Sequence, residues 1–376
     1  MNLSAKVGGI PPSATLAIGQ RAKALQRAGV DVIGLSVGEP DFATPSHITE
    51  ACIAALKRGE THYAPGNGLP ALLNAIAEKT ERENRIPCDP SQVIVTAGAK
   101  DAIHQAMQAV LNPGDEVVVL TPDWVSYEPC IRLAEGTPVF VAVDPATFQV
   151  TDALLEAVTP RTRMIVVNSP SNPSGAVLNP TSLALVADVC RENDLVALSD
   201  EIYEKLVYGA EPVSLGSLPE MAERTVTVNG FSKAYAMTGW RLGWAVGPKA
   251  IVDFMARVQS HTTSQAVTFV MHGGVAALTG TQSSVEAMRQ AFDKRRRFVL
   301  DRLAAMGYRC APADGAFYAF VNVGGDDVAT AARWLDEARV AVTPGSAFHA
   351  PGWLRLSYAA AMPRLTEALD RIAALA

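Results

Sequence analysis

The feature that most constrains this chain is an alternation of short apolar runs with stretches of helical spacing. The runs at 93–96, 117–120, 164–167, 195–198 and 226–228 are rich in β-branched residues and apolar throughout. Strands that are buried on both faces and separated by helices predict a mostly parallel α/β sheet flanked by helices. Ligands of such sheets bind outside the carboxyl ends of the strands.

The pattern changes beyond about residue 275, where a long, Arg-rich helical stretch at 283–306 begins. A second helix is expected near 327–338, with strand-like segments around it, which indicates a smaller α+β domain. We expect 1–45 to form an N-terminal arm and part of that small domain, 46–275 the large domain, and 276–376 the rest of the small domain.

Composition and charge exclude several classes of protein. The chain has 376 residues, 49% of them hydrophobic, and a net charge of -6 without a cluster of Lys and Arg, which argues against nucleic-acid binding. The N-terminus lacks the apolar core of a secretory signal, and no apolar stretch reaches the ~18 residues of a membrane span. The five cysteines are scattered without metal-ligand spacing. We therefore expect a soluble, cytoplasmic protein with reduced thiols and no metal site.

Two of the apolar runs end in segments suited to binding a polar ligand. Gly98-Ala99-Lys100 opens a helix, and free amides at a helix N-terminus favour a phosphate, although an ordinary strand-to-helix turn would look the same. Asn172 lies in a loop with two X-Pro bonds, a pattern that often contains a cis proline and a fixed backbone, or simply a turn.

The next two runs end in ionisable residues. Asp200 follows an apolar run, where a carboxylate needs a cationic partner unless it merely caps a helix. Lys233 lies among small and apolar residues, where a lysine loses its proton readily and forms a Schiff base with an aldehyde. Arg241, eight residues later, is a cation able to hold a phosphate. Together the four segments supply what pyridoxal 5'-phosphate requires of a protein.

The motifs that contain these residues resemble the class I/II aminotransferases, the aspartate-aminotransferase-like enzymes of fold type I. The resemblance extends over nearly the whole chain, and it implies the fold of the pyridoxal-phosphate-dependent transferases, with a mostly parallel, seven-stranded type of sheet in the large domain. It is carried by PPSATLAI, GEPDF, THYAPGNG, TAGAKDA, PDWVSY, VVNSPSNPSGAV, SDEIYEKLVY, NGFSKAYAMTGWRLG, GAFYAF and LRLSYA.

The resemblance implies a role for each matching residue around pyridoxal phosphate. Lys233 would carry the cofactor and shuttle a proton at the substrate's α-carbon, and Asp200 would keep the pyridine nitrogen protonated. The remaining cofactor contacts would be hydrogen bonds from Tyr203 and Asn172 to the phenolic oxygen, stacking by Trp124, and phosphate binding by Gly98, Ala99, Lys100, Ser232 and Arg241.

The resemblance also implies the substrates and the assembly. Arg355 would clamp the α-carboxylate of an amino acid or 2-oxo acid, with Gly38, Trp124 and Asn172 beside it. Tyr63 would reach the phosphate of a neighbouring subunit, so that the active unit is a homodimer. The sequence departs from the family at Gly230, where many members have a serine that contacts the phosphate; Ser232 is the alternative donor.

The substrate side chain is harder to predict. Lys100 occupies a position where aspartate-using relatives also carry Lys, and Ser13 and Thr15 resemble the same subgroup, which favours aspartate or glutamate. The alternative is that Lys100 contributes only its backbone. Pro11 and Pro12 stand where prephenate-accepting relatives tend to have a basic residue, which counts against prephenate. Aromatic amino acids, alanine and kynurenine stay open.

Three other classes compete with an aminotransferase. A C–S β-lyase would use the same lysine, aspartate and arginine, because the cofactor performs the chemistry. A pyridoxal-phosphate-binding transcription regulator would need a DNA-binding domain, for which the chain has no room before residue 11. A nucleotide-dependent dehydrogenase would need a G-x-G-x-x-G turn after an N-terminal strand, and the sequence has none.

Overall fold

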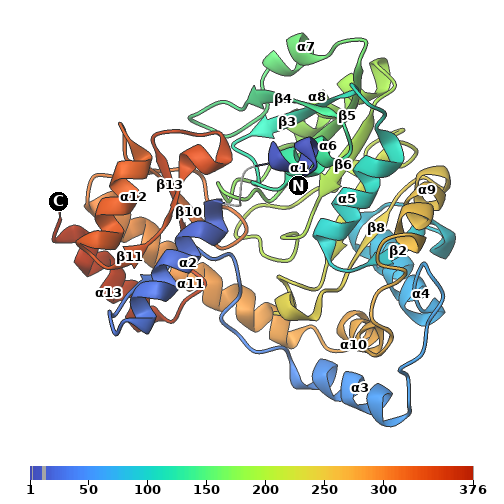
Figure 1. Cartoon of the computed structure of the whole chain (residues 1–376), viewed down its shortest axis with the longest axis horizontal. Coiled ribbons are helices and arrows are strands. Elements are labelled where there is room, and N and C mark those ends of the chain that lie inside the picture. Colours follow the sequence, from blue (N-terminus) through green and yellow to red (C-terminus); the bar gives the residue numbers. More distant parts are fainter. Residues whose placement is uncertain (2, 11–13, 376) are drawn as a thin grey trace.

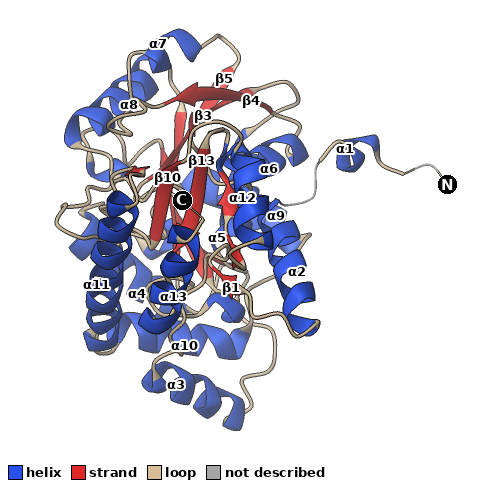
Figure 2. Cartoon of the chain, turned by 90° about the vertical axis from the view of Figure 1, so that its left-hand side faces the viewer, coloured by secondary structure: helices blue, strands red, loops and turns tan. Residues whose placement is uncertain are grey.

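The computed structural model describes residues 1, 3–10 and 14–375, with the side chains of 14–18 left out. Pro11, Pro12 and Ser13 therefore lie outside the described residues, as does the side chain of Thr15. Strands occupy the interior and helices the outside (Figure 2). The C-terminal elements lie together with α2 on one side of the molecule, and the largest sheet lies on the other (Figure 1).

The largest sheet has seven strands in the order β2-β8-β7-β6-β5-β3-β4. All neighbouring pairs are parallel except those of β8, which runs antiparallel to β2 and β7. The predicted α/β sheet is confirmed. The strands are β2 (Val93–Thr96), β3 (Glu116–Thr121), β4 (Thr137–Ala142), β5 (Thr162–Asn168), β6 (Val196–Asp200), β7 (Thr225–Gly230) and β8 (Gly243–Val246).

Both faces of this sheet are covered, which explains why its strands are apolar throughout. Alternate residues of β3 belong to different cores: Val117 and Val119 pack under α5, α6 and α9, whereas Val118 packs under α7 and α8. A third core joins β2 and β8 to α3, α4 and α10. The helices are α3 (Ser46–Lys57), α4 (Pro70–Lys79), α5 (Ala99–Val110), α6 (Tyr127–Leu133), α7 (Ala153–Ala157), α8 (Pro180–Glu192), α9 (Lys249–Ser260) and α10 (Thr268–Thr279).

Local signals set several helix boundaries. The side chain of Asn179 accepts a hydrogen bond from the Ser182 amide, and Pro180 is the first residue of α8, so that both N-terminal preferences are met there. α4 likewise begins with Pro70 and continues into a π-helical turn, η1 (Thr80–Asn84). Short 3-10 turns complete this part of the chain: η2 (Pro90–Gln92), η3 (Leu215–Ser217) and η4 (Thr238–Trp240).

The C-terminal part contains a four-stranded antiparallel sheet in the order β12-β13-β10-β9. Near the N-terminus, β1 (Ile33–Gly34) pairs in parallel with β11 (Val340–Ala341) of the C-terminal part. The other elements are α1 (Ala5–Gly8), α2 (Ala14–Arg27), α11 (Ser283–Ala305), β9 (Arg309–Cys310), β10 (Tyr318–Asn322), α12 (Asp327–Asp336), β12 (Thr343–Pro344), η5 (Gly345–Phe348), β13 (Trp353–Ser357) and α13 (Met362–Ala373).

The seven-stranded sheet lies within residues 93–246 and the four-stranded sheet within 309–357. The predicted boundaries after 45 and 275 stay a prediction, because a domain boundary is defined by independent folding or motion. In the part of the chain that the structure describes, no helix is long and apolar enough to cross a membrane. The cytoplasmic location also stays a prediction.

Candidate active site

A cavity of about 520 Å³ lies at the carboxyl ends of the parallel strands β5 and β6, facing the four-stranded sheet. The strand ends meet because Asn168 of β5 pairs in register with Asp200 of β6. Segments distant in the sequence complete the wall. Of the residues predicted for the site, those that line the cavity are Gly38, Ala99, Lys100, Trp124, Asn172, Asp200, Tyr203, Ser232, Lys233, Arg241 and Arg355.

Lys233 follows the end of β7 and extends its amine into the cavity wall. Nζ donates a hydrogen bond to the Gly38 carbonyl oxygen over 2.6 Å. Burial lowers the pKa of the amine to about 8, and the nearby positive charge of Arg355 lowers it as well. The negative charges of Glu39 and Asp200 partly oppose this shift. About a tenth of the amine is therefore neutral and nucleophilic at pH 7, far more than for an ordinary lysine.

Asp200 is a buried carboxylate at the last position of β6. Tyr127 Oη donates to Oδ2 over 2.7 Å, and the Ile202 amide donates to Oδ1 over 3.3 Å. Burial raises the pKa of the carboxyl to about 6, although these bonds and the charge of Lys233 oppose the rise. Among the described residues no Lys, Arg or His forms an ion pair with it, so the carboxylate can still accept a cationic partner.

Arg355 is the opposite case, a buried cation on β13 with 3% of its surface exposed. Nη1 donates to Asn172 Oδ1 over 2.8 Å and Nη2 donates to the Ser36 carbonyl oxygen over 2.6 Å. Nε has no partner among the described residues. Burial lowers the pKa of the guanidinium. A carboxylate bound in the cavity would neutralise this charge.

The opposite end of the cavity combines a helix start with a cation. α5 begins at Ala99, and its cap Gly98 has φ 91°, a conformation that disfavours side chains. A Cβ at position 98 would lie 2.5 Å from Arg241 Nη2, so glycine lets the guanidinium approach the helix N-terminus closely. Ser232 lines the same cavity. This combination suits a phosphate.

Gly230, where many family members have serine, is the last residue of β7. A Cβ there would lie 3.1 Å from the Gly243 Cα and from the Leu242 carbonyl oxygen. A side chain at 230 would therefore press against β8. Ser232 is the hydroxyl of this segment that lines the cavity.

Lys100 and Trp124 lie together on one wall. The Lys100 amine is 4.9 Å from the centroid of the Trp124 ring, and burial lowers the pKa of the amine. Tyr63 does not line the cavity of its own chain and is 90% exposed. An exposed position is what a residue acting in a neighbouring subunit requires.

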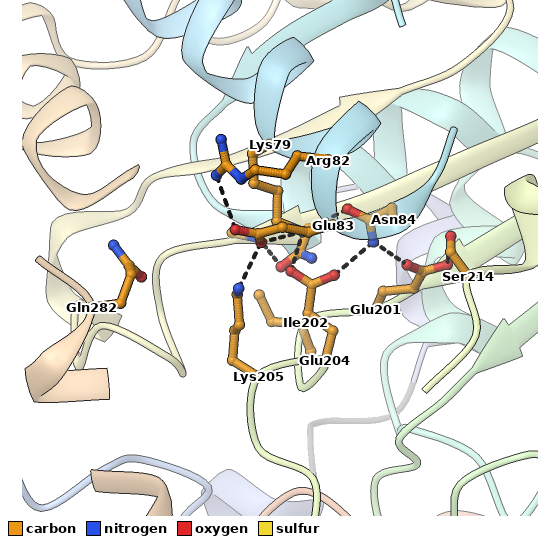
Figure 3. Close-up of polar contacts among 12 residues, drawn as sticks. Lys79, Arg82, Glu83, Asn84, Glu201, Ile202, Glu204, Lys205, Ser214 and Gln282 are labelled. Atoms are coloured by element: carbon orange, nitrogen blue, oxygen red, sulfur yellow. Dashed lines mark hydrogen bonds and ion pairs between the residues drawn. The ribbon is translucent and has the colours of Figure 1, made fainter. Parts of the chain in front are cut away.

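A polar network anchors the turn that carries Asp200 and Tyr203 (Figure 3). Asn84 of η1 donates to Glu201 Oε2 over 3.1 Å and to Glu204 Oε2 over 2.7 Å. The Lys79 amine bonds to Asn84 and pairs with Glu204. Ser214 donates to Glu201 Oε1 over 2.7 Å. Buried carboxylates with several hydrogen bonds hold the nearby backbone rigidly. The network therefore stabilises the conformation of the turn that carries Asp200 and Tyr203.

Several polar residues in or beside the cavity were not predicted from the sequence, among them Ser36, Asn168, Tyr127 and Tyr318. Tyr127 and Tyr318 stand in the motifs PDWVSY and GAFYAF, and these motifs were the available signal. The loop with two X-Pro bonds does contain cis prolines, at Ser169-Pro170 and Asn172-Pro173.

Comparison with known proteins gives full-length relatives. The sequence profile described as Aminotransferase class I and II matches residues 30–372. The chain is 44% identical to an aspartate aminotransferase of Geobacillus stearothermophilus, covering 99% of this chain and 98% of the relative. It is 45% identical to an aspartate/prephenate aminotransferase of Thermus thermophilus, with coverage of 99% and 98%.

Solved structures agree. The aspartate aminotransferase from Thermus thermophilus with maleate superimposes with a TM-score of 0.97 at 44% identity, over 100% of both chains. An aromatic aminotransferase from Pyrococcus horikoshii superimposes with a TM-score of 0.89 at 42% identity, over 94% of this chain and 98% of that one. The enzymes of this family use pyridoxal phosphate. The chain belongs to the class I and II aminotransferases and is a transaminase of the aspartate-aminotransferase-like kind.

Proposed function

We propose that this aminotransferase moves the amino group of L-aspartate or L-glutamate to a 2-oxo acid in two half-reactions. The observation that supports this choice is that, besides Lys233 and Arg241, two further cations line the cavity, Arg355 on β13 and Lys100 on α5. A dicarboxylic amino acid can place one carboxylate on each. The similar structure from Thermus thermophilus was solved with maleate, which is also a dicarboxylate.

The cavity has groups that fit each end of pyridoxal phosphate. Asp200 would pair with the ring nitrogen, because it is buried without a cation in the described chain. Arg241, Ser232 and the first amides of α5 would hold the phosphate, Trp124 would stack on the ring, and Tyr203 and Asn172 would reach the ring oxygen. When bound, the cofactor supplies an electron sink for negative charge at the substrate's α-carbon.

The residues of the chain would then divide the work as follows. Arg355 would bind the α-carboxylate with Gly38 beside it, and Lys100 would receive the distal carboxylate. Lys233 Nζ, with its lowered pKa, would carry a proton to and from the α-carbon. Asp200 would hold the ring nitrogen in its protonated form. Tyr63 would complete the phosphate site of a partner subunit, so we also propose a homodimer.

The test is a single-turnover half-reaction. Cofactor-loaded protein is mixed separately with L-aspartate, L-glutamate, L-alanine and L-phenylalanine, and the absorbance of the bound cofactor is followed. We expect rapid conversion with the two acidic amino acids. Lys100→Gln should slow aspartate by about 10- to 100-fold, the value of one charge-assisted hydrogen bond, and leave alanine unchanged. Lys233→Ala should abolish turnover.

Other results would redirect the proposal. Conversion only with alanine or phenylalanine keeps the aminotransferase and removes the dicarboxylate preference. Pyruvate and ammonia released without a 2-oxo acid acceptor would instead identify a C–S β-lyase. Full activity of Lys233→Ala would remove the assignment of the cofactor site altogether.

Prephenate is a second candidate acceptor, because several relatives of 41–45% identity carry it in their names. The sequence argument against prephenate depends on Pro11 and Pro12, which lie outside the described residues. Regeneration of the aldehyde form of the cofactor by prephenate, compared with 2-oxoglutarate and oxaloacetate, separates the two possibilities.

A further inference from the structure

Tyr318, the first residue of β10, reaches the cavity from the four-stranded sheet. It is 1% exposed, and its hydroxyl lies 2.8 Å from the hydroxyl of Tyr203. Its ring lies under the Arg355 guanidinium, 4.6 Å from ring centroid to Cζ. The side chain therefore contacts two residues to which the proposed function gives roles, although it has no role of its own so far.

Either hydroxyl could donate across this distance, and the role proposed for Tyr203 decides which of them does. Burial raises the pKa of Tyr318, but the positive charge of Arg355 opposes the rise. Burial also raises the pKa of Tyr203, to well above its usual range, and the phenol of Tyr318 and the carboxylate of Asp200 raise it further. Both phenols therefore keep their protons near neutral pH. Each phenol has a single proton, so a bond from Tyr318 to Tyr203 leaves the Tyr203 proton free for another acceptor.

Close packing holds the Tyr318 hydroxyl in this place. A Cβ at position 38 would lie 2.1 Å from Tyr318 Oη, so the hydroxyl occupies the space that a side chain at 38 would fill. The Gly38 carbonyl oxygen meanwhile accepts the bond from Lys233 Nζ. The charged groups around the tyrosine pair are Arg355 from β13, Asp200 from β6, Lys233 after β7 and Glu39 beside Gly38.

We propose that Tyr318 is a positioning residue whose hydroxyl donates to Tyr203 and so directs the Tyr203 proton to the ring oxygen of pyridoxal phosphate. The inference rests on the proposed role of Tyr203. Hydrogen bonds in a chain strengthen one another in a buried environment, so Tyr318 supports the bond that Tyr203 makes. In the cofactor-loaded protein that bond would stabilise negative charge on the ring oxygen, and it would thereby lower the pKa at which the bound cofactor loses its proton.

The test is a pH titration of the visible absorbance of the bound cofactor, without substrate, in Tyr318→Phe. The variant keeps the ring under Arg355 and loses only the hydroxyl. We expect the midpoint to move upward by about 0.5 to 1 pH unit, which corresponds to one ordinary hydrogen bond. Tyr203→Phe should move it further. The double variant should titrate like Tyr203→Phe alone, because Tyr318 acts through Tyr203.

The matched control is Tyr208→Phe. Tyr208 belongs to the same core as Tyr318, and its buried hydroxyl donates to the Ala316 carbonyl oxygen over 2.6 Å, outside the cavity. Tyr208→Phe should be less stable to unfolding than the wild type, and the midpoint of its cofactor absorbance titration should be unchanged. Gly38→Ala provides a second route to the same result, because its methyl group displaces the Tyr318 hydroxyl while both phenols remain; its midpoint should also rise.

The possible contrary results distinguish failure of the role of Tyr318, of the role of Tyr203 and of the proposed function. A shift in Tyr203→Phe without one in Tyr318→Phe and Gly38→Ala overturns the inference and leaves the role of Tyr203. Full additivity in the double variant also overturns it, since Tyr318 would then act independently. If Tyr203→Phe causes no shift, the role of Tyr203 fails and the inference fails with it. A wild-type protein without cofactor absorbance would refute the proposed function itself.

Discussion

Arg355 is a buried cation that no carboxylate of the described chain neutralises, and this makes it the residue whose chemistry is easiest to isolate. Two of its nitrogen atoms are committed to Asn172 and Ser36, while Nε has no partner in that part of the chain. Its surroundings therefore keep the guanidinium plane fixed before a ligand arrives. A preorganised cation of this kind reduces the entropy lost on binding.

Replacement of Arg355 by lysine tests this interpretation at the residue scale. A lysine keeps the charge but cannot form two parallel hydrogen bonds to a carboxylate. We expect Arg355→Lys to lower kcat/KM for every amino acid by about 10- to 100-fold, mainly through KM, as measured by steady-state kinetics. Arg295→Lys is the control, because Arg295 makes a two-point contact with Asp41 outside the cavity. An unchanged kcat/KM in Arg355→Lys would remove the residue from the site.

Some residues of the cavity could be predicted from their type and position in the sequence, and others could not, for a physical reason. Asp200 and Lys233 come shortly after apolar runs, where a charge is costly, and Arg241 stands in the same motif as Lys233, so their positions stand out in the sequence. Tyr127 and Tyr318 are aromatic residues whose type and sequence neighbours indicate no particular role. What distinguishes them is a hydroxyl close to Asp200 or Tyr203, and these contacts form only when distant segments pack together.

At the scale of elements, one contact joins the loop before α6 to the turn η5. His349 Nδ1 lies 2.6 Å from Asp123 Oδ1, and the Asp123 amide donates to the Phe348 carbonyl oxygen over 3.2 Å. Asp123 precedes Trp124, and Phe348 packs 4.8 Å from the Arg355 guanidinium. The link therefore connects the wall proposed for the cofactor ring with the wall proposed for the substrate carboxylate.

This link should make stability depend on pH. The hydrogen bond to Asp123 raises the pKa of His349, and burial raises the pKa of Asp123, so the folded protein holds the shared proton more tightly than the unfolded chain. The stabilisation is fully present below the ordinary histidine value of 6.5 and is lost as pH rises through the higher folded value. We expect a loss of about 1 kcal/mol or less between about pH 6 and pH 9, because His349 is partly exposed.

Urea unfolding at the two pH values measures the effect. In His349→Gln the part of the pH dependence due to this link should disappear, whereas His261→Gln, at an exposed helix end, should behave like the wild type. An equal loss of stability in wild type and His349→Gln would show that the pair does not titrate in this range.

The same scale shows which elements the sequence pattern could predict. The strands β2, β3, β5, β6 and β7, which are buried over most of their length, were predicted, because a strand covered on both faces is largely apolar. β4 was missed, since it is an edge strand with several exposed positions. β8 was also missed, because it follows the lysine motif directly and no separate turn signal in the sequence indicates where the strand begins. The strand-like segment before residue 345 forms as two short strands, β11 and β12, because Val342 lies between two different pairings.

At the scale of the whole molecule, the cavity lies between two sheets that belong to different parts of the chain, and Tyr63 lies outside it. Other large apolar side chains, Ile53 and Leu56 of α3, are also exposed, at 44% and 43%. Exposed apolar residues close in the sequence to a predicted site residue are consistent with the proposed homodimer.

Mixing two inactive variants tests the dimer and the shared site together. Tyr63→Ala damages the partner's cavity, whereas Lys233→Ala damages its own. When the two variants are unfolded and refolded together, each mixed dimer contains one cavity with both residues intact. We therefore expect the mixture to regain about a quarter of wild-type activity, from half of the dimers being mixed with one good site each. Activity no higher than the sum of the separate variants would exclude a site shared through Tyr63.

The contact between Gly38 and the Tyr318 hydroxyl also has a consequence for the history of the sequence. The Tyr318 hydroxyl occupies the space that a Cβ at position 38 would need, although the two positions lie far apart in the sequence. Position 38 therefore cannot gain a side chain while the hydroxyl stays. A lineage that loses the hydroxyl gains room for a side chain at 38, and a lineage that acquires such a side chain first is penalised until the hydroxyl is gone. Packing alone thus restricts the order of substitutions at these two positions: the Tyr318 hydroxyl has to be lost before a side chain at position 38 is tolerated.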